Sequence, residues 1–161
     1  MTNNSLFNRV LLTVVVLAAL GGVCASASAK DGGNAYLMKR ASQTFDAVRK
    51  HMATDDKVLL QEAVPVKEGQ NPYSFLWGYS AMVSSVSAMY EASGDKHWLD
   101  VMDGMMLKGL DKYYDTKRQP AGYASYVNTA PQSDRFYDDN IWLGIDMADL
   151  YAATGKKSYL Q

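Results

Sequence analysis

The sequence has 161 residues, of which 48% are hydrophobic and 20% are charged. This composition is that of an ordinary globular protein, and it excludes a disordered or fibrous chain. The formal net charge is −1, with both signs spread along the sequence, so no basic field would hold nucleic acid or anionic lipid. We therefore expect neither nucleic acid nor a membrane surface among its partners.

The first 29 residues are typical of an export signal. Arg9 provides the positive flank, an apolar run covers residues 10–20, and residues 27–29 form an A-x-A cleavage site. The apolar run is too short to cross a bilayer as a helix. We expect a mature chain that begins near Lys30, is secreted or periplasmic, and has no membrane segment.

Cys24 is the only cysteine in the sequence, and it lies inside this signal. The mature protein would therefore have no disulfide and no cysteine-based metal site. A lipid anchor would make Cys24 the new N-terminus, but Val23 is bulkier than the small residue that precedes a lipidated cysteine. We therefore expect cleavage of the signal rather than lipidation.

The rest of the chain has apolar residues at helical spacing. This spacing predicts helices at residues 34–52, 73–92, 95–114 and 138–154. Gly94 and Gly155 follow the second and fourth of them, where glycine commonly ends a helix, and residues 156–161 have the pattern of one more helix start. Two long loops, 55–72 and 115–134, contain proline and glycine and separate these helices in pairs.

Two stretches of the sequence resemble each other at an offset of 61 positions: YEASGDKHWL, which begins at Tyr90, and YAATGKKSYL, which begins at Tyr151. Each contains a helix end, a glycine and a new helix start, so the repeating unit is a helical hairpin with its loop. The short links at Gly94 and Gly155 thus alternate with the two long loops at residues 55–72 and 115–134. This alternation is typical of a helical toroid, with tight turns at one rim and the long loops and the site at the other.

Two adjacent acids, Asp138 and Asp139, lie among aromatic residues in the stretch DRFYDDNIWLG, where the second long loop enters a helix. One interpretation is structural, because aspartate often caps a helix and first-turn acids complement the helix dipole. The other is glycoside hydrolysis, in which one carboxyl group protonates the leaving oxygen while the second attacks the anomeric carbon or activates water. Like charge and desolvation would raise one carboxyl pKa, while the helix start would stabilise the other carboxylate.

The sequence resembles glycoside hydrolase family 76, the endo-α-1,6-mannanases. The resemblance rests on FLWGYSAMVSSVSAMYEASGDKHWLD from Phe75, GYASY from Gly122 and FYDDNIWLGIDMADLYAATGKKSYL from Phe136, and it covers the chain from about Asn34 to its end. It implies an all-α fold of helical hairpins from an (α/α)6 toroid and retaining cleavage of α-1,6-linked mannan. It further implies that Asp138 is the nucleophile, that Asp139 is the general acid/base, and that no catalytic metal or other cofactor takes part.

Five aromatic residues and one amide are candidates for contact with a sugar: Trp77, Tyr79, Tyr123, Tyr137, Asn140 and Trp142. Large aromatic residues also dominate protein cores, and Asn140 can equally fold back onto the helix start. A second acidic pair, Asp55 and Asp56, has no aromatic company and is expected to be solvated. His51 and His97 have no partner ligands near them in the sequence, so we expect no metal site.

At about 60 residues per hairpin, the chain supplies roughly two of six hairpins. We therefore expect residues 30–161 to be the N-terminal part of a larger catalytic domain, with apolar helix faces left exposed and little solubility or activity in isolation. Three functions fit these observations: a hydrolase of α-mannan, a transglycosylase of cell-wall mannan, and a non-catalytic helical-repeat module that binds protein. The few basic residues near the presumed groove disfavour an acidic sugar, such as the substrates of unsaturated uronyl hydrolases.

Overall fold

A computed structural model describes residues 31–160. The expected signal at residues 1–29, with Cys24, lies outside the described residues. The chain divides into two units between Leu37 and Met38, and the second unit holds every element after the first turns of α2. None of the described helices combines the length and the apolar character that a membrane crossing requires.

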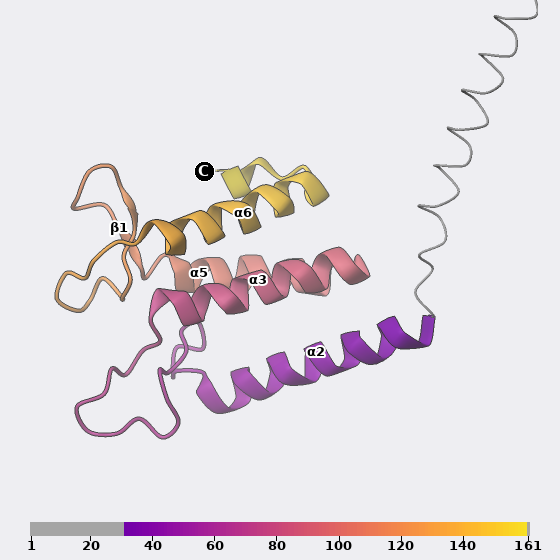
Figure 1. Cartoon of the computed structure of the whole chain (residues 1–161), viewed down its shortest axis with the longest axis horizontal. Helices are drawn as coiled ribbons and strands as arrows, with labels where there is room; N and C mark the ends of the chain where they lie inside the picture. The colour runs from indigo at the N-terminus through magenta and orange to yellow at the C-terminus, as the bar shows by residue number, and fades with distance from the viewer. Residues whose placement is uncertain (1–30, 161) are drawn as a thin grey trace, which may run out of the picture. The chain divides into compact units, whose positions relative to one another are not determined.

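The described residues are mainly helical, as expected, and Figure 1 shows the order of the elements. The helices are α2 (Asp31–Met52), α3 (Leu76–Ser93), α4 (His97–Val101), the π-helix η1 (Met102–Met106), α5 (Leu107–Leu110), α6 (Tyr137–Thr154) and the 3-10 helix η2 (Lys157–Leu160). Two short antiparallel strands, β1 (Tyr114–Asp115) and β2 (Gly122–Tyr123), pair Tyr114 with Tyr123. The predicted all-α class is confirmed.

Helix α3 packs against α4, η1 and α6. Its side chains Leu76, Tyr79, Val83 and Val86 are fully buried, in keeping with a sequence that is apolar around most of the helix. The Tyr79 hydroxyl donates a hydrogen bond of 2.6 Å to the Val58 carbonyl. This bond ties the first long loop to the core, because Val58 belongs to that loop.

The two repeated stretches form the same turn. Gly94 and Gly155 have φ angles of +65° and +69°, and each N–H donates a bond of 2.7 Å to the tyrosine carbonyl four positions earlier. Glycine adopts this left-handed conformation without the steric cost of a Cβ, which explains why both helices end there. Trp98 and Tyr159, at corresponding positions after the glycines, are both buried in the core.

The segment expected as one helix over residues 95–114 is shorter and irregular. It begins at His97, passes through the π turn of η1 and ends at Leu110. Met102, Met105 and Met106 are all buried in or beside this turn, and unbranched methionine adapts to its irregular spacing. The helix start expected after residue 156 is a single 3-10 turn.

One face of α6 is apolar and exposed. Tyr137, Ile141 and Ile145 follow each other at intervals of one helical turn, and more than 40% of each is exposed.

Candidate active site

Helix α6 begins beside the two adjacent acids. Its N-cap residue is Phe136, in an extended conformation and without a capping hydrogen bond from its side chain, and Asp138 and Asp139 lie in the first turn. The interpretation of the acids as N-caps is therefore wrong, because neither occupies the cap position. Their place in the first turn still suits the helix dipole.

A pocket of about 410 Å³ lies at this helix start, and we call it the acid pocket. It is lined by Phe75, Trp77, Ser125, Phe136, Asp138 and Asp139. The start of α3, the loop before α6 and the first turn of α6 each contribute to its wall. Aromatic rings therefore lie on the same surface as the two carboxyl groups.

The two carboxyl groups have different surroundings. Only 5% of Asp139 is exposed, whereas Asp138 is exposed to solvent. Burial raises the pKa of Asp139, and the neighbouring charge of Asp138 raises it further. A buried carboxyl group with a raised pKa beside an exposed carboxyl group is the difference in environment that a proton donor and a nucleophile need.

Backbone hydrogen bonds hold the walls of the acid pocket together. The N–H of Leu76, the first residue of α3, donates to the Ser125 carbonyl at 2.9 Å, and the Ser125 N–H donates to the Asp134 carbonyl at 2.8 Å. The loop that crosses the pocket is thus attached both to the start of α3 and to the segment that leads into α6.

Asn140 fixes the same loop from the other side. Its Oδ1 accepts the Tyr123 N–H at 2.8 Å, and its Nδ2 donates to the carbonyls of Tyr123 and Phe136, each at 2.9 Å. Both amide donors are therefore used by backbone groups. Asn140 therefore folds back onto the start of α6, which was one of the two interpretations of its place in the sequence, and it also binds the backbone of β2.

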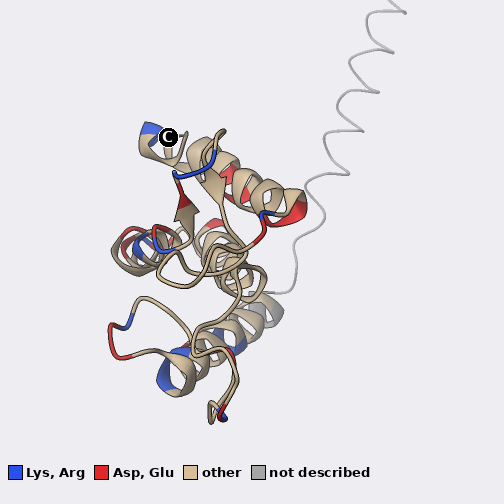
Figure 2. Cartoon of the chain, turned by 90° about the vertical axis from the view of Figure 1, so that its left-hand side faces the viewer, with Lys and Arg blue, Asp and Glu red and all other residues tan. Residues whose placement is uncertain are grey.

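Figure 2 shows charged positions of both signs on the side of the molecule that faces the viewer. Within residues 31–160, no three His, Cys, Asp or Glu side chains are grouped as metal ligands.

The structure is similar to the glycoside hydrolase family 76 mannosidase Bt3792 from Bacteroides thetaiotaomicron VPI-5482. The TM-score is 0.59, the sequences are 26% identical, and the match covers 78% of this chain and 34% of that chain. The chain has a glycoside hydrolase family 76-like fold. It spans about a third of the length of the mannosidase. Comparisons with protein-family models and with curated protein sequences give no match.

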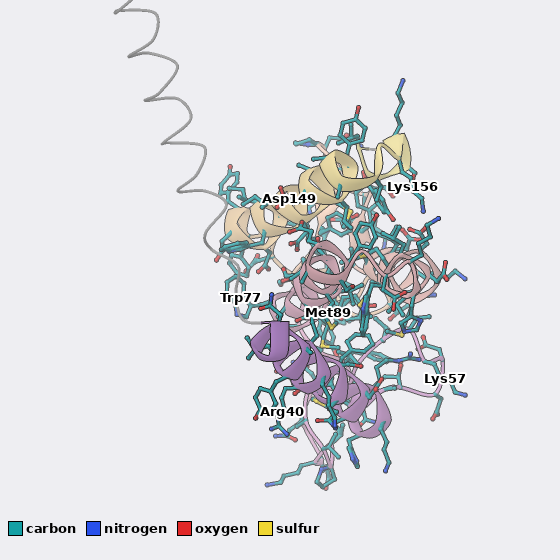
Figure 3. The ribbon with its side chains drawn as sticks, turned by 90° about the vertical axis from the view of Figure 1, so that its right-hand side faces the viewer. Arg40, Lys57, Trp77, Met89, Asp149 and Lys156 are labelled. Carbon is teal, nitrogen blue, oxygen red and sulfur yellow. The ribbon has the colours of Figure 1, made fainter. Side chains whose placement is uncertain are left out.

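In this family 76-like fold the predicted sugar contacts lie in three different surroundings. Trp77 lines the acid pocket and is 57% exposed, and Figure 3 shows it at the edge of the molecule, whereas Met89 lies in the interior. Tyr137 and Asn140 line a second pocket of about 360 Å³, which shares Phe136 with the first. Tyr123 lines a third pocket of about 360 Å³, which also includes Asn140, and its ring packs against Tyr114.

The remaining two aromatic candidates lie outside these three pockets. Tyr79 is fully buried with its hydroxyl bonded to the Val58 carbonyl, so its expected contact with a sugar is incompatible with this structure. Two positions along a helix separate side chains by more than a right angle, which explains why Trp77 faces the pocket and Tyr79 the core. Trp142 is half exposed on α6 and lines none of the three pockets.

Phe75 and Ser125 line the acid pocket, but the sequence interpretation did not select them. Phe75 and Phe136 are the N-cap residues of α3 and α6, and they are 61 positions apart, which is the offset of the internal repeat. Extending the repeat to its first residues would have found both phenylalanines. Ser125 lies in the GYASY stretch, which pointed to this loop but not to one residue.

Proposed function

We propose that the protein is a glycoside hydrolase that cleaves α-1,6-mannosidic linkages of mannan with retention of configuration. The fold similarity supports a glycoside hydrolase and a carbohydrate substrate. The observation that carries the proposal is the unlike pair in the acid pocket, with Asp139 buried and Asp138 exposed between aromatic rings. Export from the cell, from the signal-like first 29 residues, belongs to the same proposal.

The proposed reaction has two steps. In the first, Asp138 attacks the anomeric carbon of a mannosyl residue while Asp139 donates its proton to the glycosidic oxygen, which leaves as an alcohol. In the second, Asp139, now a carboxylate, takes a proton from water, and the water oxygen displaces Asp138 from the anomeric carbon. Two inversions give net retention, and Asp139 regains its proton.

The aromatic walls give the pocket its affinity for a sugar ring. Trp77, Phe75 and Phe136 offer flat apolar faces to the C–H groups of the ring, beside the two carboxyl groups. Burial raises the pKa of Asp139, which suits its carboxyl group to donate a proton to the glycosidic oxygen. The aromatic rings and the proposed proton donor therefore lie in the same pocket.

The test is product analysis with the full-length protein and α-1,6-linked mannan, for the wild type and for Asp138→Asn and Asp139→Asn. Release of mannooligosaccharides by the wild type and its loss in both variants support the proposal. Transglycosylation shares the first step and differs in the second, in which a sugar hydroxyl replaces water. Longer products after addition of a mannooligosaccharide acceptor would identify that alternative.

A further inference from the structure

Asp115 is a buried carboxylate outside the acid pocket. It is the last residue of β1, and only 3% of it is exposed. Its oxygens accept the Arg118 Nε–H at 2.6 Å and the Lys117 N–H at 2.8 Å, and Arg135 Nε lies 3.7 Å away. The Arg118 hydrogen bond, the Lys117 N–H and the two guanidinium charges lower the pKa of Asp115 to about 2, against the opposing effect of burial.

The two arginines join separate parts of the second long loop around this carboxylate. Arg118 Nη2 donates to the Ser133 carbonyl at 2.6 Å, and Arg135 Nη1 donates to the Pro120 carbonyl. Residues 115–120 are thereby fastened to residues 133–135. Asp115 is buried, whereas the two arginine side chains are partly exposed. A charge-assisted pair that is bonded on both sides constrains geometry more strongly than a fully exposed pair.

The fastened segment leads directly to the acid pocket. The Tyr126 N–H donates to Ser133 Oγ at 3.0 Å, and the Ser125 N–H donates to the Asp134 carbonyl at 2.8 Å. Arg135 is followed in the chain by Phe136, the N-cap of α6 and part of the pocket wall. Asp115 is therefore linked, through the two arginines and the backbone bonds of this segment, to Ser125 and Phe136, which line the acid pocket together with Asp139.

We propose that Asp115 is a positioning residue of the acid pocket, which acts through Arg118 and Arg135 to hold the loop wall of Ser125 and Phe136 in place over Asp139. This inference rests on the proposed function for its catalytic consequence. Its structural content is narrower: without the Asp115 carboxylate, the wall loosens and Asp139 becomes more exposed to water.

The test is Asp115→Asn in the full-length protein, followed by the pH dependence of kcat/KM on α-1,6-linked mannan. Because burial is the larger cause of the raised pKa of Asp139, the alkaline limb of the profile should move toward the ordinary carboxyl range. We expect kcat to fall at least tenfold. If Asp115 had a merely structural role, its substitution would lower stability without moving the alkaline limb of the profile.

Asp56→Asn is the matched control. Asp56 organises the first long loop in a similar way, since it accepts the Thr54 hydroxyl at 2.6 Å and the Val58 and Leu59 N–H groups at 3.0 and 3.2 Å. These bonds stay within residues 54–59. We expect Asp56→Asn to lower the melting temperature and to leave the pH profile unchanged.

A second readout separates this inference from the proposed function. Carbon-13 NMR of labelled aspartate carboxyl groups follows the titration of Asp139 whether or not mannan is cleaved. A lower pKa of Asp139 in Asp115→Asn supports the positioning role, and an unchanged value overturns it. If Asp115→Asn does not fold, Arg118→Gln removes the shortest contact and should move the Asp139 titration in the same direction, and an unchanged titration there also overturns the inference.

Discussion

Asp138 and Asp139 are consecutive in the first turn of α6, yet only 5% of Asp139 is exposed whereas Asp138 is exposed to solvent. A helix turns by 100° per residue, so one side chain can point into the pocket wall while its neighbour points out. The two carboxyl groups therefore differ in environment without any difference in residue type.

The first prediction concerns catalysis. Asp138→Asn and Asp139→Asn should each lower kcat/KM on α-1,6-linked mannan by at least about 10²–10⁴-fold, because each removes a group that forms or breaks a bond in the proposed reaction. Urea unfolding should show changes within about 1 kcal/mol, since neither carboxylate caps the helix. Undiminished mannan cleavage by either variant would contradict the catalytic role assigned to that carboxyl group.

The second prediction concerns stability and pH. Burial raises the pKa of Asp139 in the folded state, so the folded protein holds this proton over a pH range in which the unfolded chain has lost it. Its contribution to the free energy of unfolding is therefore lost as pH rises from the ordinary carboxyl value through the raised pKa. The free energy of unfolding of Asp139→Asn should therefore increase relative to that of the wild type as pH rises from 3 to 7.

Asp115→Asn should give the opposite trend, at lower pH. The pKa of Asp115 is lowered to about 2 in the fold, so its stabilisation is lost as pH falls from the ordinary carboxyl value toward 2. This variant should lose stability relative to wild type as pH rises from 2 to 4. Parallel trends in the two variants would contradict the assigned environments.

The third prediction concerns packing at Gly109. A Cβ at this position would lie 1.8 Å from the Tyr79 hydroxyl oxygen and 2.5 Å from the Val58 carbonyl oxygen. Gly109→Ala should lower the free energy of unfolding by at least about 2 kcal/mol, through overpacking and loss of the Tyr79 hydrogen bond. Gly104→Ala, whose Cβ meets no atom within 4 Å, should be neutral or stabilising by up to about 1 kcal/mol. Equal melting temperatures for the two variants would refute the close approach.

The fourth prediction separates sugar binding from stability on α3. Trp77→Ala should weaken binding of a mannooligosaccharide by about ten- to a hundredfold, because it removes an exposed ring from the pocket wall. Tyr79→Phe should leave binding unchanged and lower stability by about 1–2 kcal/mol, since it removes a buried hydrogen bond. Calorimetric titration and thermal unfolding measure the two effects, and the reverse pattern would be incompatible with the site.

Features that depend on local chemistry could be predicted from the sequence. Gly94 and Gly155 end their helices because only a left-handed residue fits there, and α6 begins one residue before the predicted start at Asp138. The π turn of η1 and the pairing of Tyr114 with Tyr123 were not predicted, since they depend on packing and on hydrogen bonds between residues distant in the sequence.

The same distinction holds for the site. Asp138, Asp139 and Trp77 could be selected by residue type and by the family resemblance, and the structure places all three at the acid pocket. Ser125 reaches the pocket through its backbone bond to Leu76, and the influence of Asp115 passes through two arginines, so neither leaves a signal in a local pattern.

The most direct test of the central claim is the stereochemistry of cleavage by the full-length protein. Proton NMR of the anomeric signals during hydrolysis of an α-1,6-linked mannooligosaccharide measures it. The account predicts that the α-anomer is formed first and that Asp138→Asn forms neither anomer. First formation of the β-anomer would contradict the retaining role of Asp138, and the absence of any cleavage by the wild type would contradict the function itself.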